Sequence, residues 1–176
     1  MKDDFTSHML LQKQIIRETV ATLKKSFSYE TIAEKSRLIC NRLVQTDLFQ
    51  KATCIAIYCS TKKEVQTLQL IEEWRYRKHF VLPVISGEYM HFFSEGTITP
   101  PEEIDLFVVP GIAFDYACIR LGRGKGYYDR YLSNTNKPTI GLSFDFQLFE
   151  SMPYEQHDKK MTLVITETVI VSSHHQ

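Results

Sequence analysis

Apolar residues recur every three or four positions over the first quarter of the chain, the spacing that places side chains on one face of an α-helix. Two series have this spacing: Ile16, Val20, Leu23 and Phe27, then Ile32, Ser36, Ile39 and Leu43. Ser28 stands between them and is a residue type that caps helix starts. The pattern therefore predicts two N-terminal helices, the second of which begins just after Ser28.

Farther along the chain, short apolar runs replace the helical spacing, and Gly, Pro, Asn and Ser punctuate them. We expect these runs to be buried strands: 54–58, 80–83, 90–93, 106–109, 139–142 and 163–166. Helical spacing returns over 65–78 and 127–132, whereas the proline-containing segment 99–103 should be a surface loop. Strands that alternate with helices favour a mainly parallel sheet with helices on both faces, here in one domain over 1–176.

The charge balance excludes a strong overall electrostatic field. Lys plus Arg and Asp plus Glu each number 21, so nothing in the net charge favours nucleic acid or an anionic membrane. The four cysteines form no Cys-x-x-Cys pair, which argues against a disulfide framework or structural zinc.

No apolar run reaches the roughly 20 residues of a membrane span, and no signal-peptide pattern occurs, so we expect a cytoplasmic protein. His174 and His175 are expected to form a solvated tail.

The clearest chemical signal is the segment Arg120-Leu-Gly-Arg-Gly-Lys-Gly-Tyr-Tyr-Asp-Arg130. Its three alternate glycines free the backbone to adopt positive φ angles and to bring amide N–H groups close to a ligand. Arg120, Arg123 and Lys125 add positive charge to the same loop. The helix predicted over 127–132 would point its N-terminus at this loop and favour an anion there. The segment is therefore typical of a phosphate site.

Glycine spacing alone does not distinguish this phosphate site from a basic, mobile hairpin loop. The spacing matches neither a Walker loop, since no Gly-Lys-Ser/Thr occurs, nor a dinucleotide-binding fingerprint. With its flanks, the run Arg-Leu-Gly-x-Gly-x-Gly-Tyr-Tyr-Asp, preceded by Pro-x-x-Ala-Phe-Asp at 110–115, resembles the signature of the 5-formyltetrahydrofolate cyclo-ligases, or methenyltetrahydrofolate synthetases. The resemblance covers nearly the whole chain, at Lys13, 58–67, Gly141, His157-Asp158 and Thr166-Glu167.

The resemblance implies an activity and a fold. It implies conversion of 5-formyltetrahydrofolate (folinic acid) and ATP, with Mg²⁺, into 5,10-methenyltetrahydrofolate, ADP and phosphate. The formyl oxygen would attack the γ-phosphorus to give an iminium phosphate, and N10 would then attack that carbon as phosphate leaves. The implied fold is a three-layer α/β/α domain with a mainly parallel central sheet, similar to the NagB/RpiA/CoA transferase-like fold. The folate, with or without a polyglutamate tail, would be the partner of a monomer that binds neither nucleic acid nor membrane.

Carried over position by position, the resemblance also implies a role for individual residues. The implied ATP-binding set is Lys13, Gln14, Arg17, Arg120, Leu121, Gly122, Arg123, Gly124, Lys125, Gly126, Tyr127 and Tyr128. The implied substrate-binding set is Cys59, Glu64, Arg123, Gly124, Lys125, Gly126 and Tyr127. The implied catalytic set is Arg123, Lys125, Tyr127 and Asp129. Asp129 is also the expected metal ligand, because Mg²⁺ takes one or two protein carboxylates and completes its shell with phosphate oxygens and water.

Two of these assignments have simpler alternatives. Lys13 and Arg17 share a helix face, but together with Lys24 they would also make an ordinary solvated basic stripe. Glu64 would also suit the first turn of the helix that follows it, where the helix dipole favours an acid.

The sequence departs from the family pattern in two places. Four residues after Asp158, where the family usually has a second aspartate, this chain has Thr162, a poorer partner for Mg²⁺. The connection before Asp105 is short, and 96–100 resembles the remnant of an element that lines the folate side. These departures motivate a second hypothesis, a folate- or nucleotide-binding homologue with weakened or lost catalysis. A third is another phosphate-ligand enzyme on the same fold, such as a sugar-phosphate isomerase or a CoA transferase.

Overall fold

The computed structural model describes residues 2–155 and 158–173, with only the backbone described for 2–6. The predictions on His157, His174 and His175 therefore lie outside the described residues. A central eight-stranded sheet has the order β11-β10-β8-β5-β1-β2-β3-β4. Its strands are β1 (Cys54–Ile57), β2 (His79–Ser86), β3 (Tyr89–Ser94), β4 (Thr97–Thr99), β5 (Leu106–Pro110), β8 (Thr139–Leu142), β10 (Leu163–Ile165) and β11 (Ile170–Ser172). The five strands from β10 to β2 pair in parallel, which confirms the predicted sheet, and the outer strands β11, β3 and β4 pair antiparallel.

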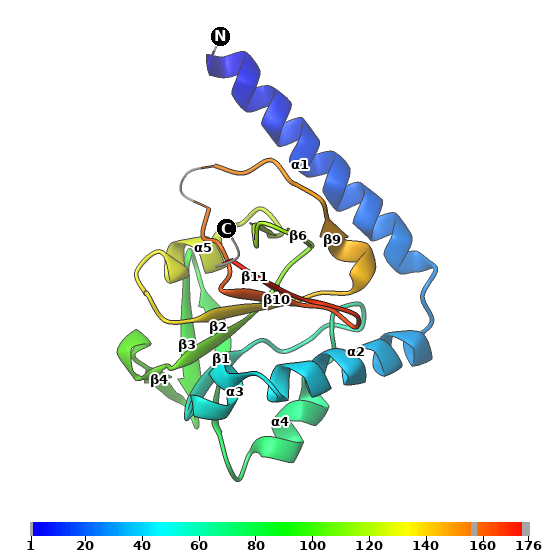
Figure 1. The fold of residues 1–176 in the computed structure, drawn as a ribbon. Helices are drawn as coiled ribbons and strands as arrows, with labels where there is room; N and C mark the ends of the chain where they lie inside the picture. Colours follow the sequence, from blue (N-terminus) through cyan, green and yellow to red (C-terminus); the bar gives the residue numbers. More distant parts are fainter. Residues whose placement is uncertain (1, 156–157, 174–176) are drawn as a thin grey trace.

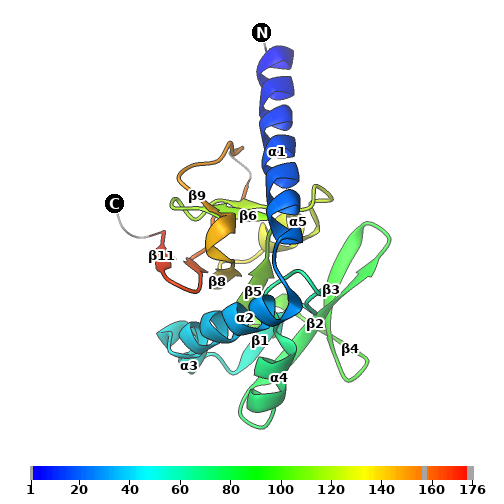
Figure 2. The ribbon, with the colours of Figure 1, turned by 90° about the vertical axis from the view of Figure 1, so that its right-hand side faces the viewer.

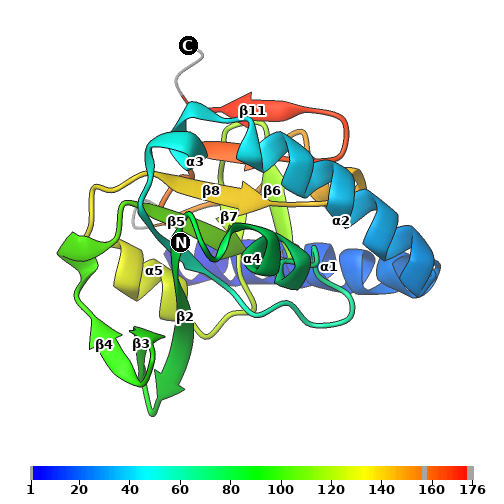
Figure 3. The same ribbon diagram turned by 90° about the horizontal axis from the view of Figure 1, so that it is seen from below.

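One face of the sheet is covered by helices, as Figure 3 shows. These are α2 (Tyr29–Val44), α3 (Asp47–Lys51) and α4 (Leu68–Trp74). Helix α2 begins as predicted, since the Ser28 side chain accepts the N–H of Thr31 at 3.2 Å. Its apolar face is fully buried in one core with alternate residues of the strands, such as Leu106 and Val108 of β5.

The opposite face is covered differently from the prediction. Phe107 and Val109 of β5 point to this side, where they share a core with Phe114 and Leu132. The covering elements are α5 (Tyr127–Leu132), which has the predicted bounds, and a small sheet of β7 (Arg120–Leu121), β6 (Ala113–Asp115) and β9 (Leu148–Phe149). The second face therefore carries one short helix and a small sheet rather than a full helical layer.

Helix α1 (Lys2–Lys25) packs on this small sheet rather than on the main one (Figures 1 and 2). Val20 contributes to a separate core with Ala113, Ile119 and Leu121. In Figure 2 the N-terminal part of α1 extends past the rest of the molecule. This docking brings Arg17, in the later half of α1, beside the glycine-rich loop.

Two element boundaries differ from the sequence-based expectation. The helix expected over 65–78 is confined to α4, because Thr67 is its N-cap and hydrogen-bonds the Tyr58 carbonyl at 2.8 Å. Within the expected loop 99–103, Pro101–Glu103 forms the 3₁₀ helix η1. Proline is compatible with that position because the first N–H groups of a helix have no internal partner. A second 3₁₀ helix, η2, spans Asp145–Gln147.

Gly141 should be intolerant of a side chain. A Cβ there would lie 2.3 Å from the Phe114 ring, which is fully buried. We expect Gly141→Ala to lower the free energy of unfolding by about 1–3 kcal/mol, the cost of overpacking a core, as measured by denaturant unfolding. Adding Phe114→Leu to this variant should recover part of the loss in a double-mutant cycle. Strictly additive losses would show that the two side chains do not compete for space.

Candidate active site

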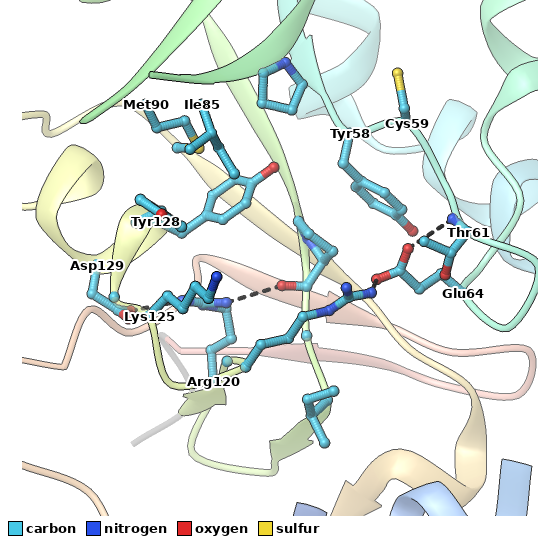
Figure 4. A pocket seen from close by; sticks show the side chains of 18 residues that line it. Tyr58, Cys59, Thr61, Glu64, Ile85, Met90, Arg120, Lys125, Tyr128 and Asp129 are labelled. Carbon is cyan, nitrogen blue, oxygen red and sulfur yellow. Dashed lines mark hydrogen bonds and ion pairs between the residues drawn. The ribbon is translucent and has the colours of Figure 1, made fainter. Parts of the chain in front are cut away.

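A cavity of about 280 Å³ opens at the carboxyl ends of β1 and β5, the usual ligand position in an open α/β sheet (Figure 4). We call it the central cavity. The β2–β3 hairpin supplies its apolar wall through Pro83, Ile85 and Met90. The remaining lining comes from the segment after β1, the segment after β5 and the glycine loop: Tyr58, Cys59, Thr61, Glu64, Pro110, Gly111, Ile112, Arg120, Gly122, Arg123, Lys125, Gly126, Tyr127, Tyr128 and Asp129.

A second cavity, of about 440 Å³, lies between α1 and the other side of the glycine loop. We call it the outer cavity. Its basic lining residues are Lys13, Arg17, Arg120 and Arg130. Arg120, Gly122, Gly126 and Asp129 line both cavities and therefore form a wall between them.

Arg120 is the buried centre of this wall. Its side chain is only 4% exposed, and it donates from Nη2 to Asp129 Oδ1 at 2.8 Å and from Nη1 to the Pro110 carbonyl at 3.0 Å. The Nε–H is buried and has no hydrogen-bond partner among the residues that the structure describes. Arg120, which was expected to bind phosphate, is therefore the ion-pair partner of Asp129, which was expected to bind the metal. The guanidinium holds the Asp129 carboxylate in place.

The glycines of the loop serve two different purposes. Gly124 and Gly126 have φ angles of 93° and 68°, as predicted, which favour glycine over any residue with a Cβ. The prediction is wrong for Gly122, which is absent from the positive-φ glycines of the described chain. A Cβ at Gly122 would lie 3.0 Å from Arg120 Nη1, so this glycine instead makes room for the buried guanidinium.

The Pro-x-x-Ala-Phe-Asp part of the signature is structural. Asp115 is buried, and its carboxylate accepts the backbone N–H groups of Ala117, Ile119 and Met152 at 2.8–3.0 Å. Burial raises the pKa of Asp115, although these hydrogen bonds oppose the shift. The carboxylate closes the turn between β6 and β7 and so positions Arg120 at the start of the loop.

Glu64 and Arg123, which are 59 residues apart, meet across the central cavity. Arg123 Nη2 donates to Glu64 Oε1 at 2.6 Å, and the other carboxylate oxygen accepts the Thr61 N–H at 2.8 Å. The alternative in which Glu64 belongs to the first turn of a helix is wrong, because α4 begins at Leu68 and has no acid in that turn. Glu64 instead orders its own turn and faces the ligand space.

Lys13 and Arg17 are not the solvated stripe that was the simpler alternative. Lys13 is buried, and its Nζ lies 3.0 Å from Glu155 and 3.1 Å from Asp158. Burial alone would lower the pKa of Lys13, but its hydrogen bonds and attraction to these carboxylates outweigh that effect and raise it. Arg17 Nε donates to the Gly122 carbonyl at 3.1 Å, which docks α1 on the glycine loop.

Lys24 is also partly buried. Burial is the main reason that the pKa of Lys24 is lowered. The charge of Glu64 raises this pKa, and the charge of Arg123 lowers it.

Three further residues of the predicted ATP set have different surroundings. Gln14 is exposed, donates to Glu18 at 2.7 Å and is absent from the described lining of both cavities. Leu121 lines the outer cavity while packing in the core with Val20. Lys125 is exposed beside the central cavity, and within the described chain its ammonium group has no hydrogen bond or ion pair.

The two tyrosines at the start of α5 differ in their polar contacts. The Tyr128 hydroxyl is buried at the central cavity without a hydrogen-bond partner in the described part of the chain, and burial raises its pKa well above the usual value. The hydroxyl therefore remains protonated and can donate to a ligand. Tyr127 is hydrogen-bonded to the Gly87 carbonyl at 3.3 Å, in the turn of the β2–β3 hairpin.

The two departures from the family pattern lie outside the described linings of these cavities. Thr162 Oγ1 accepts the N–H of Thr139 at 3.0 Å, at the amino ends of β8 and β10, whereas the cavities lie at carboxyl ends. Asp129 lines both cavities, and Thr162 is absent from the described lining of either. Within 96–100, Thr97–Thr99 forms the edge strand β4, and the hairpin residues Ile85 and Met90 line the central cavity instead.

The residues around Asp129 fit a magnesium ion that shares its shell with phosphate. Asp129 is partly exposed and lines both cavities, while Oδ1 is occupied by Arg120. No cluster of three or more His, Cys, Asp or Glu side chains suited to a metal occurs among the residues whose placement is described. Glu155 and Asp158 also line the outer cavity but are paired with Lys13, so Asp129 is the carboxylate that matches the way Mg²⁺ is bound together with substrate phosphates.

Sequence reasoning missed two groups of residues at the site. The first group is the apolar wall from β2 and β3, whose residues belong to no recognisable motif. Only a prediction that β2 and β3 pair as a hairpin would have placed them at the central cavity. Arg130 was part of the recognised run but had no role, although it lines the outer cavity.

Comparison with known proteins agrees with this arrangement. The model of the 5-formyltetrahydrofolate cyclo-ligase family matches residues 10–167. The chain is 32% identical to the 5-formyltetrahydrofolate cyclo-ligase of Mycoplasma pneumoniae, over 89% of this chain and 96% of that protein. It is similar to the solved 5,10-methenyltetrahydrofolate synthetase of Aquifex aeolicus (TM-score 0.84, 28% identity, 93% and 94% of the two chains). The solved synthetase from Mycoplasma pneumoniae gives a TM-score of 0.80 at 26% identity, over 88% and 98% of the chains. The chain therefore belongs to the 5-formyltetrahydrofolate cyclo-ligase family.

Proposed function

We propose that this protein converts 5-formyltetrahydrofolate and ATP, with Mg²⁺, into 5,10-methenyltetrahydrofolate, ADP and phosphate. The observation that carries the proposal is the wall shared by the two cavities. It is built from the signature residues Arg120, Gly122, Gly126 and Asp129 and separates a cavity with an apolar hairpin wall from one lined mainly by charged residues of α1, the glycine loop and α5. Such a wall suits the transfer of a phosphoryl group from one substrate to another.

The composition of each cavity supports one substrate. The central cavity combines the apolar hairpin wall with Glu64 and the unpartnered hydroxyl of Tyr128, which suits a flat pterin with polar edges. The outer cavity has Arg17 and Arg130 beside the glycine loop, which suits the phosphates of ATP, while its Lys13 is paired with Glu155 and Asp158. We assign the folate to the former and the nucleotide to the latter.

The protein's part in the reaction is positioning and charge stabilisation. Arg123 and Lys125 line the central cavity, on the folate side of the wall, where they would stabilise charge on the phosphoryl group as it passes to the formyl oxygen. Asp129 would hold Mg²⁺, which supplies charge neutralisation on the phosphates. Attack by the formyl oxygen would give the iminium phosphate, which makes phosphate the leaving group when N10 closes the ring.

A direct assay tests the proposal. The purified protein should form methenyltetrahydrofolate, followed by its absorbance, only when 5-formyltetrahydrofolate, ATP and Mg²⁺ are all present. ADP and phosphate should appear in equal amounts to the product. Tight binding of both substrates without product at any Mg²⁺ concentration would instead establish the non-catalytic homologue.

The competing hypotheses have less support. The hypothesis of a non-catalytic homologue rests on Thr162, whose side chain bonds the start of β8 and is absent from the described lining of both cavities. A sugar-phosphate isomerase or a CoA transferase is not favoured by membership of the cyclo-ligase family.

Within the described chain, none of the helices has the length and apolar character required to cross a bilayer. We propose a cytoplasmic monomer.

Lys125 should be required for nucleotide binding. Its ammonium group is free of protein partners in the described structure and reaches toward the wall (Figure 4). Lys125→Ala should weaken ATP binding at least tenfold by calorimetry, about 1.4 kcal/mol, the scale of one charge-assisted contact. Arg123→Ala should have a similar effect. Lys62→Ala, which removes an exposed lysine outside the cavity lining, is the matched control, and an ATP affinity unchanged by Lys125→Ala would exclude this loop from the phosphate site.

A further inference from the structure

The guanidinium of Arg130 joins the glycine loop to the β2–β3 hairpin. Nη1 donates to the Lys125 carbonyl at 2.9 Å, and Nη2 donates to the Glu88 carbonyl, in the hairpin turn, at 3.0 Å. The same group lies 5.3 Å from the centroid of the Tyr127 ring. Arg130 also lines the outer cavity, so one side chain contacts the nucleotide side and the wall of the folate side.

Within the described chain, the part of the hairpin that Arg130 holds has no third strand beside it. Its other supports are the hydrogen bond of the Tyr127 hydroxyl to the Gly87 carbonyl and the packing of Met90 in the core. Strand β1 pairs with β2 only as far as Val81, and β4 pairs with β3 only from Phe92 onward. Residues 84–91 therefore form a two-stranded extension of the eight-stranded sheet, which we call the ribbon, and a two-stranded hairpin is marginally stable by itself. This ribbon carries Ile85 and Met90 of the central cavity, so the shape of the cavity depends on what holds the ribbon in place.

The loop is built to let the arginine reach across. A Cβ at Gly126 would lie 2.8 Å from Arg130 Nη1, and the φ angle of Gly126 is 68°. Glycine is thus required there both for the backbone and for the passage of the guanidinium. Arginine is suited to the task because its planar fork has five N–H donors. Two are used on carbonyl groups, and the others, which have no partner among the described residues, would be available to an anion in the outer cavity.

We propose that Arg130 is a positioning residue that couples occupation of the two cavities. A nucleotide phosphate beside Arg130 holds the guanidinium in its bridging position, which holds the hairpin ribbon and forms the folate wall. Because coupling between binding sites is reciprocal, the folate must tighten the nucleotide by the same factor. The identity of the two ligands rests on the proposed function, whereas the bridge itself does not.

Hydrogen exchange measures the bridge directly. In Arg130→Gln, amides of residues 84–91 should exchange at least tenfold faster than in the native protein, since two charge-assisted hydrogen bonds are lost. Amides of β1 and β5 should be unchanged. A non-hydrolysable ATP analogue with Mg²⁺ should slow exchange of the ribbon in the native protein and not in the variant. Arg130→Lys keeps the charge without the fork, so it should retain nucleotide affinity but not ribbon protection.

Binding and kinetics test the coupling. In the native protein the analogue should tighten 5-formyltetrahydrofolate by at least fivefold in calorimetry, and Arg130→Gln should lose this factor. The KM for the folate should rise more than kcat falls. Arg75→Gln is the matched control, because Arg75 also lies over a tyrosine ring, at 4.8 Å from that of Tyr76, but contributes to neither cavity.

Unchanged ribbon exchange in Arg130→Gln, or equal protection by the analogue in both proteins, would overturn the proposal. If Arg130→Gln does not fold, Arg130→Lys provides the same comparison. Exchange of the unliganded protein requires no turnover, so a failed cyclisation assay would refute the proposed function and leave the bridge to be judged on its own result.

Discussion

Replacing Asp129 with asparagine should reduce cyclisation about a thousandfold, the upper range for loss of one electrostatic stabiliser at a reacting centre. The substitution removes the carboxylate charge available to Mg²⁺ and leaves the Arg120 guanidinium, whose side chain is 4% exposed, without its ion-pair partner. The rate should be measured at saturating substrates over a range of Mg²⁺ concentrations. We expect the residual activity to need more Mg²⁺ than the native enzyme.

The same substitution should cost about 1–3 kcal/mol of stability, the penalty for a buried charge that loses part of its compensation. Rates must therefore be compared well below the melting temperature of the variant. Asp47→Asn is the matched control, because Asp47 is an exposed aspartate paired with Lys51 at 3.7 Å. It should retain both activity and stability. An Asp129→Asn enzyme within tenfold of the native rate, with the same Mg²⁺ dependence, would exclude Asp129 as the metal ligand.

Glu64→Gln should lose most turnover, about a hundredfold, while ATP affinity remains normal. Glutamine preserves an oxygen for the Thr61 N–H but removes the negative charge at the mouth of the central cavity. Arg123, the other partner of Glu64, is largely exposed, so the loss of this ion pair should matter little for stability. The melting temperature should stay within a few degrees of the native value.

Calorimetry with each substrate separately locates the effect of Glu64→Gln. Folate affinity should fall, and the affinity for an ATP analogue should not. Glu73→Gln, on the exposed side of α4, serves as a control for removing one surface carboxylate. A large drop in melting temperature together with normal turnover would mean that Glu64 acts on the fold and not on the substrate.

Local patterns predicted the elements whose stability depends on nearby residues. Ser28 marked the start of α2 because a helix cap requires only residues three positions apart. Helix α5 has the predicted bounds for a similar reason, since Gly126 precedes it in a left-handed conformation that separates loop from helix. Helix α4 is shorter than its apolar spacing suggested, because Thr67 bonds to a strand end that lies nine residues earlier.

The sequence by itself determined the parallel sheet, the glycine loop as a candidate phosphate site and, through the signature, the family. Only the tertiary structure decided that Arg120 is buried against Asp129, that Glu64 meets Arg123, and that Arg130 bridges the loop to the hairpin. The physical reason is the range of the interactions. Helix caps and amphipathic faces depend on residues within one or two turns of the chain. The site depends instead on distant carbonyl and carboxylate groups, which come within hydrogen-bond reach of Arg120, Arg123 and Arg130 only when the sheets and helices pack together.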